Sequence, residues 1–581
     1  MKNKIFKITI SLILITALMF NLLSMTASTV DLSKVSRYLC EKMNENPTAT
    51  HPVSIWLTSP DISVEQATLK TAVATIHENA HIELSSIDIS CQETLDDIRI
   101  NYRTSVTELY SKNNSAFVSS CIDKNDIVFI SRYAPMIIAN LTNDEIRNLT
   151  RASDVISMDY HIELEFEPND DISITKNLTN DLVNTFETMA NYLTSYTGEG
   201  IKIGVMDITF PIQSEISNCN IGGFSETYDV QKADNHCTYV TKTILQYAPD
   251  STYYFARVPT SGSSALFIYE LTEWLIDNGV NVINMSMTNQ RSSNFSTYNN
   301  YAKWFDHIAY THYIPVIKSA GNNQQNIEMN GVTTPGMAYN IITVGAMRTP
   351  NDMDLASSYY NEYQNPIYAS KPDISADTYS YANYNLGTSY ATAHITGMIA
   401  LMLTLDSQLE FSPELIKAIL TSAVDPNGSH FLPTMRSTVG INYMQAGAGF
   451  ASLYHTLTVT NNRQSRCSSM HPTQQEYNIP LVITTDNIGL TYRISMAYTI
   501  PAECIGTHTA GNTVIAAIPN LDLAICPPNS TIPIVVSATT FNNVEIVEFT
   551  PQIAGTYTIK VIQTTPSTDT TYWGVAWNIF N

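Results

Sequence analysis

The alternation of short apolar strands with helices between about Leu182 and Leu457 constrains the fold of this chain most. The runs Ile201–Met206 and Val280–Met285 are apolar throughout, as strands buried on both faces of a sheet are. A helix predicted over Ala265–Asn278 has its leucines on one face and ends at Gly279. This pattern predicts an α/β fold, with a mainly parallel sheet flanked by helices, over residues 182–457.

The regions on either side of this segment have different patterns. Residues 29–170 contain strand patterns at Val53–Leu57 and Val155–Ile162 with a short helix between them, which indicates a small α+β module and an acidic linker. Residues 475–581 alternate apolar and polar side chains with period two, for example over 556–561. This alternation predicts an all-β sandwich.

The N-terminus has the pattern of an export signal. Three lysines precede the apolar run Ile8–Leu23, and small residues follow it, which predicts a signal peptide over residues 1–28. A signal anchor that stays in the membrane is the alternative, but the apolar run is shorter than the ~20 residues of a spanning helix. We therefore expect a secreted protein without a membrane span after cleavage.

Charge and cysteine content exclude several classes of partner and site. The 30 Lys and Arg residues against 53 Asp and Glu give a net charge of −23, which argues against nucleic acid because phosphate binding needs clustered cations. The eight cysteines form no Cys-x-x-Cys pair, so a zinc ribbon or thioredoxin-type site is not supported. Export would permit one disulfide among Cys467, Cys504 and Cys526.

Four polar residues follow predicted strands or begin predicted helices in residues 182–457. Asp207 follows the strand Ile201–Met206, and Asn322 follows a second strand that ends in KSAG. His236 and Ser389 each stand at the start of a helix. Each position alone is explained by a turn, an exposed histidine or a helix cap. Together they are expected at the carboxyl edge of one sheet, where catalytic groups collect in open α/β folds.

The segments around these residues resemble the subtilisin-like serine proteases, the subtilases. GTSYATAHITG resembles the nucleophile motif, KSAGN the oxyanion segment, TGEGIKIGVMD the lead-in to the catalytic Asp, and NHCTYV the histidine motif. This resemblance covers about Asn184 to Leu457. Residues 29–170 resemble the inhibitory propeptide found before many subtilase domains, and residues 475–581 resemble the jelly-roll domain that follows some extracellular subtilases.

The resemblance implies a secreted serine endopeptidase that acts on proteins or peptides by acyl transfer. Ser389 is the implied nucleophile, His236 the general base, and Asp207 the residue that orients the imidazole. Asn322, with the backbone N–H of Ser389, is the implied oxyanion donor, and loss of such a donor typically costs ~10²–10³-fold in kcat. A histidine that titrates near ~6.5 predicts that activity falls below neutral pH.

Further site features follow from the same resemblance. The segment Ser286-Met287-Thr288 corresponds to the substrate-lining segment, and the chain's own propeptide is the implied intramolecular inhibitor. No cofactor is expected to be required. Calcium is a frequent structural ligand in subtilases, but the sequence has no compact Asp-rich loop, and no metal site is nominated.

The sequence departs from the family pattern by losing glycines near the cleft. Ile208-Thr209 stands where the family has Thr or Ser followed by Gly, and Cys237 and Thr288 also replace glycines. Glycine is needed where φ is positive or backbone approaches a ligand, so a narrowed cleft or a displaced His236 is expected.

Two interpretations of the whole chain therefore stay open: an active endopeptidase, or a catalytically impaired subtilase-fold binding protein, a pseudoprotease. Cys237 likewise is either a redox- or metal-sensitive brake or a small buried side chain that fills space.

Overall fold

The computed structural model describes the chain in two compact units. The described residues are 32–79, 89–162, 172–173, 196–259, 266–287, 298–325, 331–360, 369–380, 385–428, 445–505, 518–540, 542–566 and 570–580. The predicted signal peptide and most of the acidic linker lie outside them. Unit 1 comprises Met1–Thr58, Asn114–Ile130 and Pro135–His161, and unit 2 comprises Ser59–Asn113, Ser131–Ala134 and Ile162–Asn581.

Unit 1 is a small α+β module, as the sequence predicted for part of residues 29–170. Its antiparallel sheet has the order β2-β3-β1-β4. The strands are β1 Thr50–Leu57, β2 Ile127–Ile130, β3 Met136–Thr142 and β4 Val155–Tyr160, and the short helices are α2 Arg37–Glu45 and α5 Asn143–Leu149. A capping box between Thr142 and Glu145 begins α5.

His161 gives unit 1 a predicted acid sensitivity. Its side chain is buried, with Nδ1 3.0 Å from Ser54 Oγ, and burial lowers its pKa to about 4. In the unfolded chain the imidazole titrates near ~6.5, so the unfolded state binds more protons as the pH falls between these values. The stability contribution is complete above pH ~6.5 and is lost towards pH ~4, by about 3 kcal/mol at ~1.4 kcal/mol per pKa unit.

Amide hydrogen exchange of β1 and β3, corrected for intrinsic rates, measures this effect. Between pH 7 and 4.5 the opening free energy of wild-type unit 1 is expected to fall, and in His161→Gln the fall is expected to be much smaller. His471→Gln is the control, because His471 is exposed. Equal pH dependence in wild type and His161→Gln would contradict the assignment.

Unit 2 is built around an eight-stranded sheet with the order β12-β11-β10-β9-β6-β8-β7, to which β13 adds beside β11. The strands are β6 Lys202–Asp207, β7 Asn220–Phe224, β8 Thr252–Arg257, β9 Val282–Met285, β10 Val316–Ser319, β11 Ile342–Thr349, β12 Asp352–Met353 and β13 Ile374–Asp377. Each pair is parallel except β11 with β12. The predicted α/β fold with a mainly parallel sheet is confirmed.

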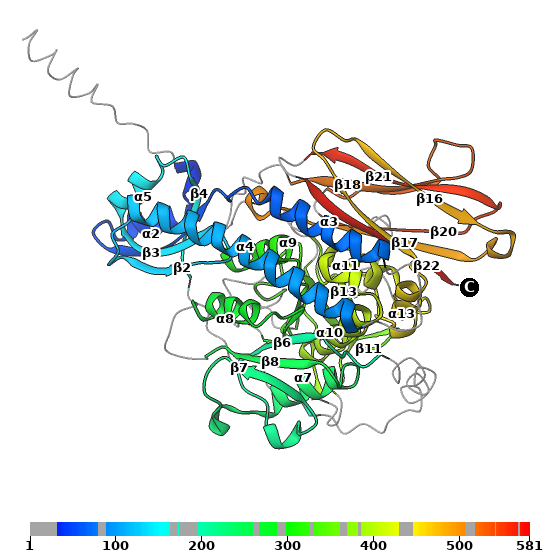
Figure 1. Cartoon of the computed structure of the whole chain (residues 1–581), viewed down its shortest axis with the longest axis horizontal. Coiled ribbons are helices and arrows are strands. Elements are labelled where there is room, and N and C mark those ends of the chain that lie inside the picture. Colours follow the sequence, from blue (N-terminus) through cyan, green and yellow to red (C-terminus); the bar gives the residue numbers. More distant parts are fainter. Residues whose placement is uncertain are drawn as a thin grey trace, which may run out of the picture. The chain divides into compact units, whose positions relative to one another are not determined.

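Helices and short elements complete unit 2 (Figure 1). The helices are α3 Ser63–Asn79, α4 Ile89–Cys121 (its last turns lie in unit 1), α7 Asn235–Leu245, α8 Leu266–Asp277, α9 Asn300–His312, α10 Thr388–Leu405, α11 Pro413–Ser422 and α13 Leu453–Asn461. Short 3₁₀ turns include η6 Ser407–Phe411 and η9 Ala502–Cys504, and β5 Ile172–Ser173 pairs with β14 Asn385–Leu386.

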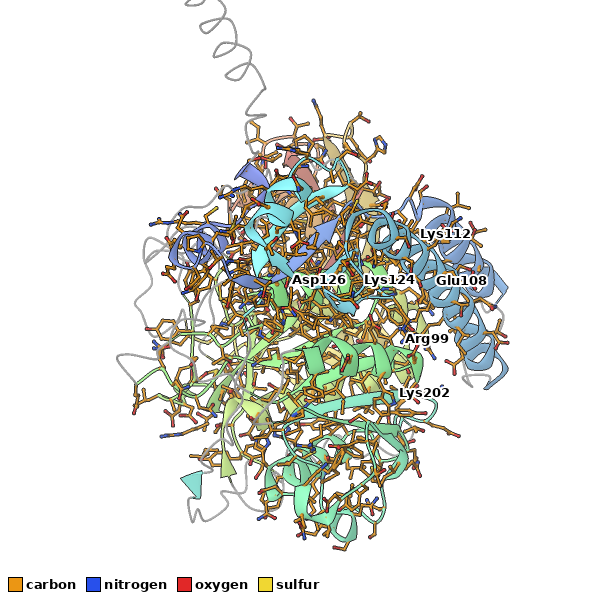
Figure 2. All side chains as sticks on the ribbon, turned by 90° about the vertical axis from the view of Figure 1, so that its left-hand side faces the viewer. Arg99, Glu108, Lys112, Lys124, Asp126 and Lys202 are labelled. Carbon is orange, nitrogen blue, oxygen red and sulfur yellow. The ribbon has the colours of Figure 1, made fainter. Side chains whose placement is uncertain are left out.

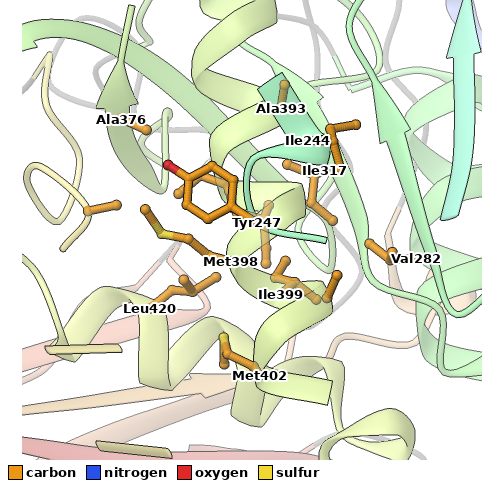
Figure 3. Close-up of a cluster of buried hydrophobic side chains, with 14 of the residues drawn as sticks. Ile244, Tyr247, Val282, Ile317, Ala376, Ala393, Met398, Ile399, Met402 and Leu420 are labelled. Atoms are coloured by element: carbon orange, nitrogen blue, oxygen red, sulfur yellow. The ribbon is translucent and has the colours of Figure 1, made fainter. Parts of the chain in front are cut away.

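The helix α10 runs through the core of unit 2. Its residues from Thr388 to Leu403 are all buried, as a helix that is apolar on every side should be. Met398, Ile399 and Met402 of this helix form one apolar cluster with Tyr247 of the segment after α7 and Leu420 of α11 (Figure 3). This burial fixes the position of the first turn of α10, which carries Ser389.

The C-terminal part of unit 2 consists of two four-stranded antiparallel sheets, ordered β15-β22-β17-β20 and β16-β21-β18-β19. The strands are β15 Ser465–Met470, β16 Glu476–Ile483, β17 Thr491–Tyr498, β18 Asn520–Cys526, β19 Val535–Ser537, β20 Val544–Phe549, β21 Gly555–Thr565 and β22 Thr571–Phe580. The period-two alternation predicted for β21 is confirmed, with Tyr557 buried and Thr556 exposed. Cys467, Cys504 and Cys526 form no disulfide in the structure, so the expected bridge among them is not present.

One of these sheets shares its core with the α/β part through α11. All ten residues of α11 are buried, and the helix packs against β17 and β22. The buried Arg493 on β17 donates to the carbonyls of Thr421 and Ala448 at 3.1 and 2.7 Å, and Thr421 Oγ1 lies 2.7 Å from Ser495 Oγ. The sandwich is therefore packed as part of unit 2.

At Gly574 of β22 this contact leaves no room for a side chain, which predicts a loss of stability in Gly574→Ala. An added Cβ would lie 2.5 Å from the Cα and 2.7 Å from the N of Leu415. These are backbone atoms, which cannot rotate out of the way as a side chain can. We expect the free energy of unfolding to fall by about 1–3 kcal/mol, measured by urea unfolding. The control is Gly223→Ala, where the nearest atom is 3.6 Å away. Equal midpoints for the two variants would contradict the prediction.

Candidate active site

Asp207 and His236 form a buried pair at the carboxyl end of β6. Asp207 is the last residue of β6, and His236 lies in the first turn of α7. Nδ1 of His236 is 2.9 Å from Oδ2 and 3.2 Å from Oδ1 of the carboxylate. Because the carboxylate accepts a hydrogen bond from Nδ1, Nε2 is the ring nitrogen that can take up a proton. Oδ1 also accepts the N–H of Ile208 at 2.7 Å, which fixes the carboxylate.

Ser389 is held against the end of β9 by a reciprocal pair of hydrogen bonds. Its Oγ donates to the carbonyl of Ser286 at 3.1 Å, and Ser286 Oγ donates to the carbonyl of Ser389 at 2.9 Å. Asn284 Nδ2 donates to Ser286 Oγ at 2.9 Å, and Thr396 Oγ1 donates to Asn284 Oδ1 at 3.0 Å. This buried chain of polar side chains makes the first turn of α10 rigid.

The side-chain amide of Asn322 is oriented by Thr388. Asn322 Oδ1 accepts both the backbone N–H and the hydroxyl of Thr388, at 3.0 and 2.9 Å. Two donors on one oxygen determine which end of the amide is which, so Nδ2 is the end left to donate elsewhere. The glycine at position 387 leaves room for this amide, because a Cβ there would lie 3.1 Å from Asn322 Nδ2. Gly321, which directly precedes Asn322, has φ +113°.

These residues lie at one edge of the sheet. Asp207 ends β6, Ser286 follows β9 and Asn322 follows β10, and these three strands are parallel neighbours. The ring of Tyr390, directly after Ser389, lies 6.0 Å from the His236 ring between centroids. The start of α10 therefore lies beside the histidine.

The predicted substrate-lining segment is only partly described. The side chains of Ser286 and Met287 are buried, and the hydroxyl of Ser286 contacts the backbone of Ser389. Thr288 lies outside the described residues.

Two of the residues that replace family glycines, Thr209 and Cys237, adopt backbone without positive φ, and the third, Thr288, lies outside the described residues. Among the described non-glycine residues, positive φ occurs at Tyr313, Arg463 and Asn529, and so not at Ile208, Thr209 or Cys237. A positive φ is therefore not required at these positions, and the narrowed cleft stays a prediction.

Cys237 points into the apolar core. It is 1% exposed, and burial, with Asp207 nearby, raises the pKa of its thiol well above the usual value. The thiolate is the form that reacts or binds metal. The structure therefore favours the interpretation of Cys237 as a packing side chain.

Sequence reasoning missed three supporting residues: Thr388, Asn284 and Lys318. Lys318 is fully buried in β10 and donates to Ser319 Oγ and Thr333 Oγ1, each at 3.1 Å, and burial lowers its pKa to about 7. Thr333 N–H in turn donates to Ala320 O at 2.9 Å, next to the Asn322 loop. A polar residue inside an otherwise apolar strand was the signal that could have identified Asn284 and Lys318.

Comparison with known proteins identifies the family. A family model described as "Subtilase family" matches residues 85–449, more than half of the chain. The chain belongs to the subtilase family. As a subtilase it is a subtilisin-like serine endopeptidase by descent, in agreement with the resemblance of its motifs.

Curated relatives of this subtilase are bacterial subtilisins. Subtilisin from Bacillus pumilus is 30% identical over 229 residues, which cover 36% of this chain and 78% of the relative. Subtilisin NAT from Bacillus subtilis subsp. natto is also 30% identical over 229 residues, but the match spans 57% of its length. The epidermin leader peptide processing serine protease from Staphylococcus aureus has a solved structure that matches with 15% identity and a TM-score of 0.43, covering 60% of this chain and 96% of that one.

The described part of this subtilase contains neither a metal-binding cluster nor a membrane-spanning helix. Within the described ranges, no group of three or more His, Cys, Asp or Glu side chains could hold a metal ion. Of the helices that the structure describes, none has the length and apolar character needed to cross a membrane.

Proposed function

We propose that this subtilase is a secreted endopeptidase precursor that hydrolyses peptide bonds of proteins through Asp207, His236 and Ser389. The observation that carries the proposal is the buried contact of 2.9 Å between His236 Nδ1 and Asp207 Oδ2. A carboxylate in this position sets the imidazole tautomer that a general base needs. The proposed reaction requires no cofactor or metal ion.

In the proposed mechanism Ser389 Oγ attacks the scissile carbonyl while His236 Nε2 takes its proton. Asp207 stabilises the resulting imidazolium, and His236 then gives the proton to the leaving amine. Asn322 Nδ2 and the Ser389 N–H donate to the oxyanion. The support for Asn322 is its orientation by Thr388, which leaves the donating end of the amide available. Water then hydrolyses the acyl-enzyme.

The N-terminal region is proposed to inhibit the precursor while its covalent link to residues 182–457 is intact, and a cut in this link is proposed to end the inhibition without removal of the region. Its support is the resemblance of residues 29–170 to subtilase propeptides. The predicted signal peptide supports export of the precursor.

A fluorophosphonate probe tests the proposed nucleophile. Intact mass after exposure is expected to show one adduct on the wild-type protein and none on Ser389→Ala, because only an activated serine reacts rapidly. Ser153→Ala is the control, and this variant should still be labelled at Ser389. Ser153 is exposed, belongs to unit 1 and is far from Ser389 in the sequence. The same spectrum gives the N-terminal residue of the secreted protein.

A folded protein, cut after the pro-region, that takes up no probe would contradict the proposal. That result would support the pseudoprotease, the binding protein on a subtilase fold. An adduct that persists in Ser389→Ala would instead assign the nucleophile to another residue.

A further inference from the structure

Part of the predicted pro-region belongs to the catalytic unit. Residues Ser59–Asn113, which we call the hairpin, contain α3 and most of α4 and group with unit 2, while the sequence on both sides of them groups with unit 1. Figure 1 shows these two helices in blue.

The helix α4 is bound to the backbone of the α/β part by buried polar side chains. Arg103, 6% exposed, donates to the carbonyls of Val280 and His312 at 3.1 and 3.4 Å. Tyr102 OH donates to the carbonyl of Thr311 at 2.8 Å. Hydrogen bonds from a charged group are stronger than those between neutral groups, and replacement of Arg103 would leave two buried carbonyls without this donor.

A buried ion pair adds to this attachment. Arg99 of α4 pairs with Glu410 of η6, and their side chains are 1% and 3% exposed. Asn281 Nδ2 also donates to Glu410 Oε1 at 3.0 Å. Replacing Arg99 while the hairpin stays in place would leave the Glu410 carboxylate buried without this cation, which is strongly destabilising. Figure 2 labels Arg99 on α4 together with Glu108 and Lys112, which are exposed.

Apolar packing covers the rest of the contact. The cluster consists of Ile62, Leu69, Tyr102, Val106, Tyr110 and Tyr313. The rings of Tyr102 and Tyr313 are 5.7 Å apart, and Lys70 Nζ lies 3.5 Å from the centre of the Tyr572 ring in the sandwich. Removal of these apolar side chains from water stabilises the contact.

The hairpin binds the edge of the sheet opposite the candidate active site. Val280 lies before β9 and His312 lies before β10, at the amino ends of parallel strands. Asp207 and Asn322 instead lie at the carboxyl ends of β6 and β10. A substrate at the carboxyl edge therefore does not compete with the hairpin.

We propose that the hairpin is a permanent part of the mature protein, so that a cut between residues 163 and 195 yields two chains that stay associated. Unit 1 stays attached as well, because its chain continues into the hairpin at Thr58–Ser59 and Asn113–Asn114. The inference rests on the proposed function in one respect: in the cell, the cut is expected to be made by the proposed endopeptidase activity. A cut made by another protease tests it independently.

The test uses the full secreted chain with Ser389→Ala and a recognition sequence for a site-specific protease inserted between Asn169 and Asp170. After complete cutting, gel filtration and native mass spectrometry are expected to show a one-to-one complex of both fragments. The double variant Arg99→Met, Arg103→Met should lose the N-terminal fragment about tenfold faster or more. Lys112→Met on the same helix is the matched control and should behave like the parent.

Separation of the cut parent protein into a free N-terminal fragment and a folded C-terminal chain would overturn the proposal, and so would equal dissociation of the parent and the double variant. If the double variant does not fold, hydrogen exchange of the cut parent decides. Amides of residues 94–113 are expected to exchange as slowly as those of β9 and β10. Exchange at the rate of an unfolded peptide would also overturn the proposal.

Discussion

Asp207→Asn is expected to lower kcat by about 10⁴-fold while the protein stays folded. The reason lies in the two contacts of the carboxylate. Oδ1 accepts the fixed N–H of Ile208 at 2.7 Å, so an asparagine must place its oxygen there and its NH₂ group at the other position. That NH₂ would face His236 Nδ1, where Oδ2 now lies at 2.9 Å. The imidazole would then carry its proton on Nε2 and could not accept one from Ser389.

The measurement is kcat on a peptide substrate, with the fluorophosphonate labelling rate as a second readout of Ser389. Asp234→Asn is the matched control, because it makes the same chemical change at the exposed N-cap two residues before His236. Asparagine caps helices as well as aspartate does, so this control should keep activity within a few-fold of wild type. A fall of less than tenfold in Asp207→Asn would remove Asp207 from the proposed mechanism.

Asp373→Asn is expected to destabilise the folded protein strongly. Asp373 Oδ2 lies 2.8 Å from Lys371 Nζ and Oδ1 lies 2.9 Å from Lys417 Nζ, and all three side chains are buried. The neutral amide would leave two buried ammonium groups without a carboxylate. Breaking a buried ion pair in this way typically lowers the free energy of unfolding by about 3–5 kcal/mol.

The same cluster sets a pH dependence. Burial opposes ionisation of Asp373, but the two lysines outweigh it and hold the pKa of the carboxyl below its usual range. A lowered pKa in the folded state means that the stability is present above the unfolded value of ~3.9 and is lost as the pH falls through the folded value.

Urea unfolding at neutral pH measures the effect of Asp373→Asn. Glu476→Gln is the control, because Glu476 forms an exposed pair with Lys560 at 3.2 Å and should contribute no more than about 1 kcal/mol. Similar unfolding midpoints for the two variants would show that the buried cluster is not what stabilises unit 2.

Much of the fold could be predicted because a strand that is buried on both faces of a sheet is apolar throughout. The apolar runs of β6 and β9 identified the parallel sheet, and the polar residues that follow strands identified the edge with Asp207 and Asn322. Side-chain orientation could not be predicted in this way. That Thr388 turns the Asn322 amide depends on two loops far apart in sequence, 66 residues along the chain.

The role of α4 could not be predicted for a related reason. From the sequence alone, Arg99 and Arg103 would be predicted to lie on the surface, because arginine is seldom buried unless it is paired. Their partners, Glu410 and the carbonyls of Val280 and His312, lie far away in the sequence, and even the nearest, Val280, is 177 residues from Arg103. For the missing glycines the backbone answers only part of the question: Cys237 adopts ordinary helical backbone, and the narrowed cleft stays a prediction.

The burial of α11 against β17 and β22 has a consequence for synthesis. All ten residues of α11 are buried, so the helix cannot remove its apolar side chains from water until β17 and β22 have been synthesised. The later of these strands, β22, ends at Phe580. Isolated helices of this length are marginal in water. We therefore expect α11 to pack fully only after β22 has been synthesised, so that this part of unit 2 folds late during synthesis.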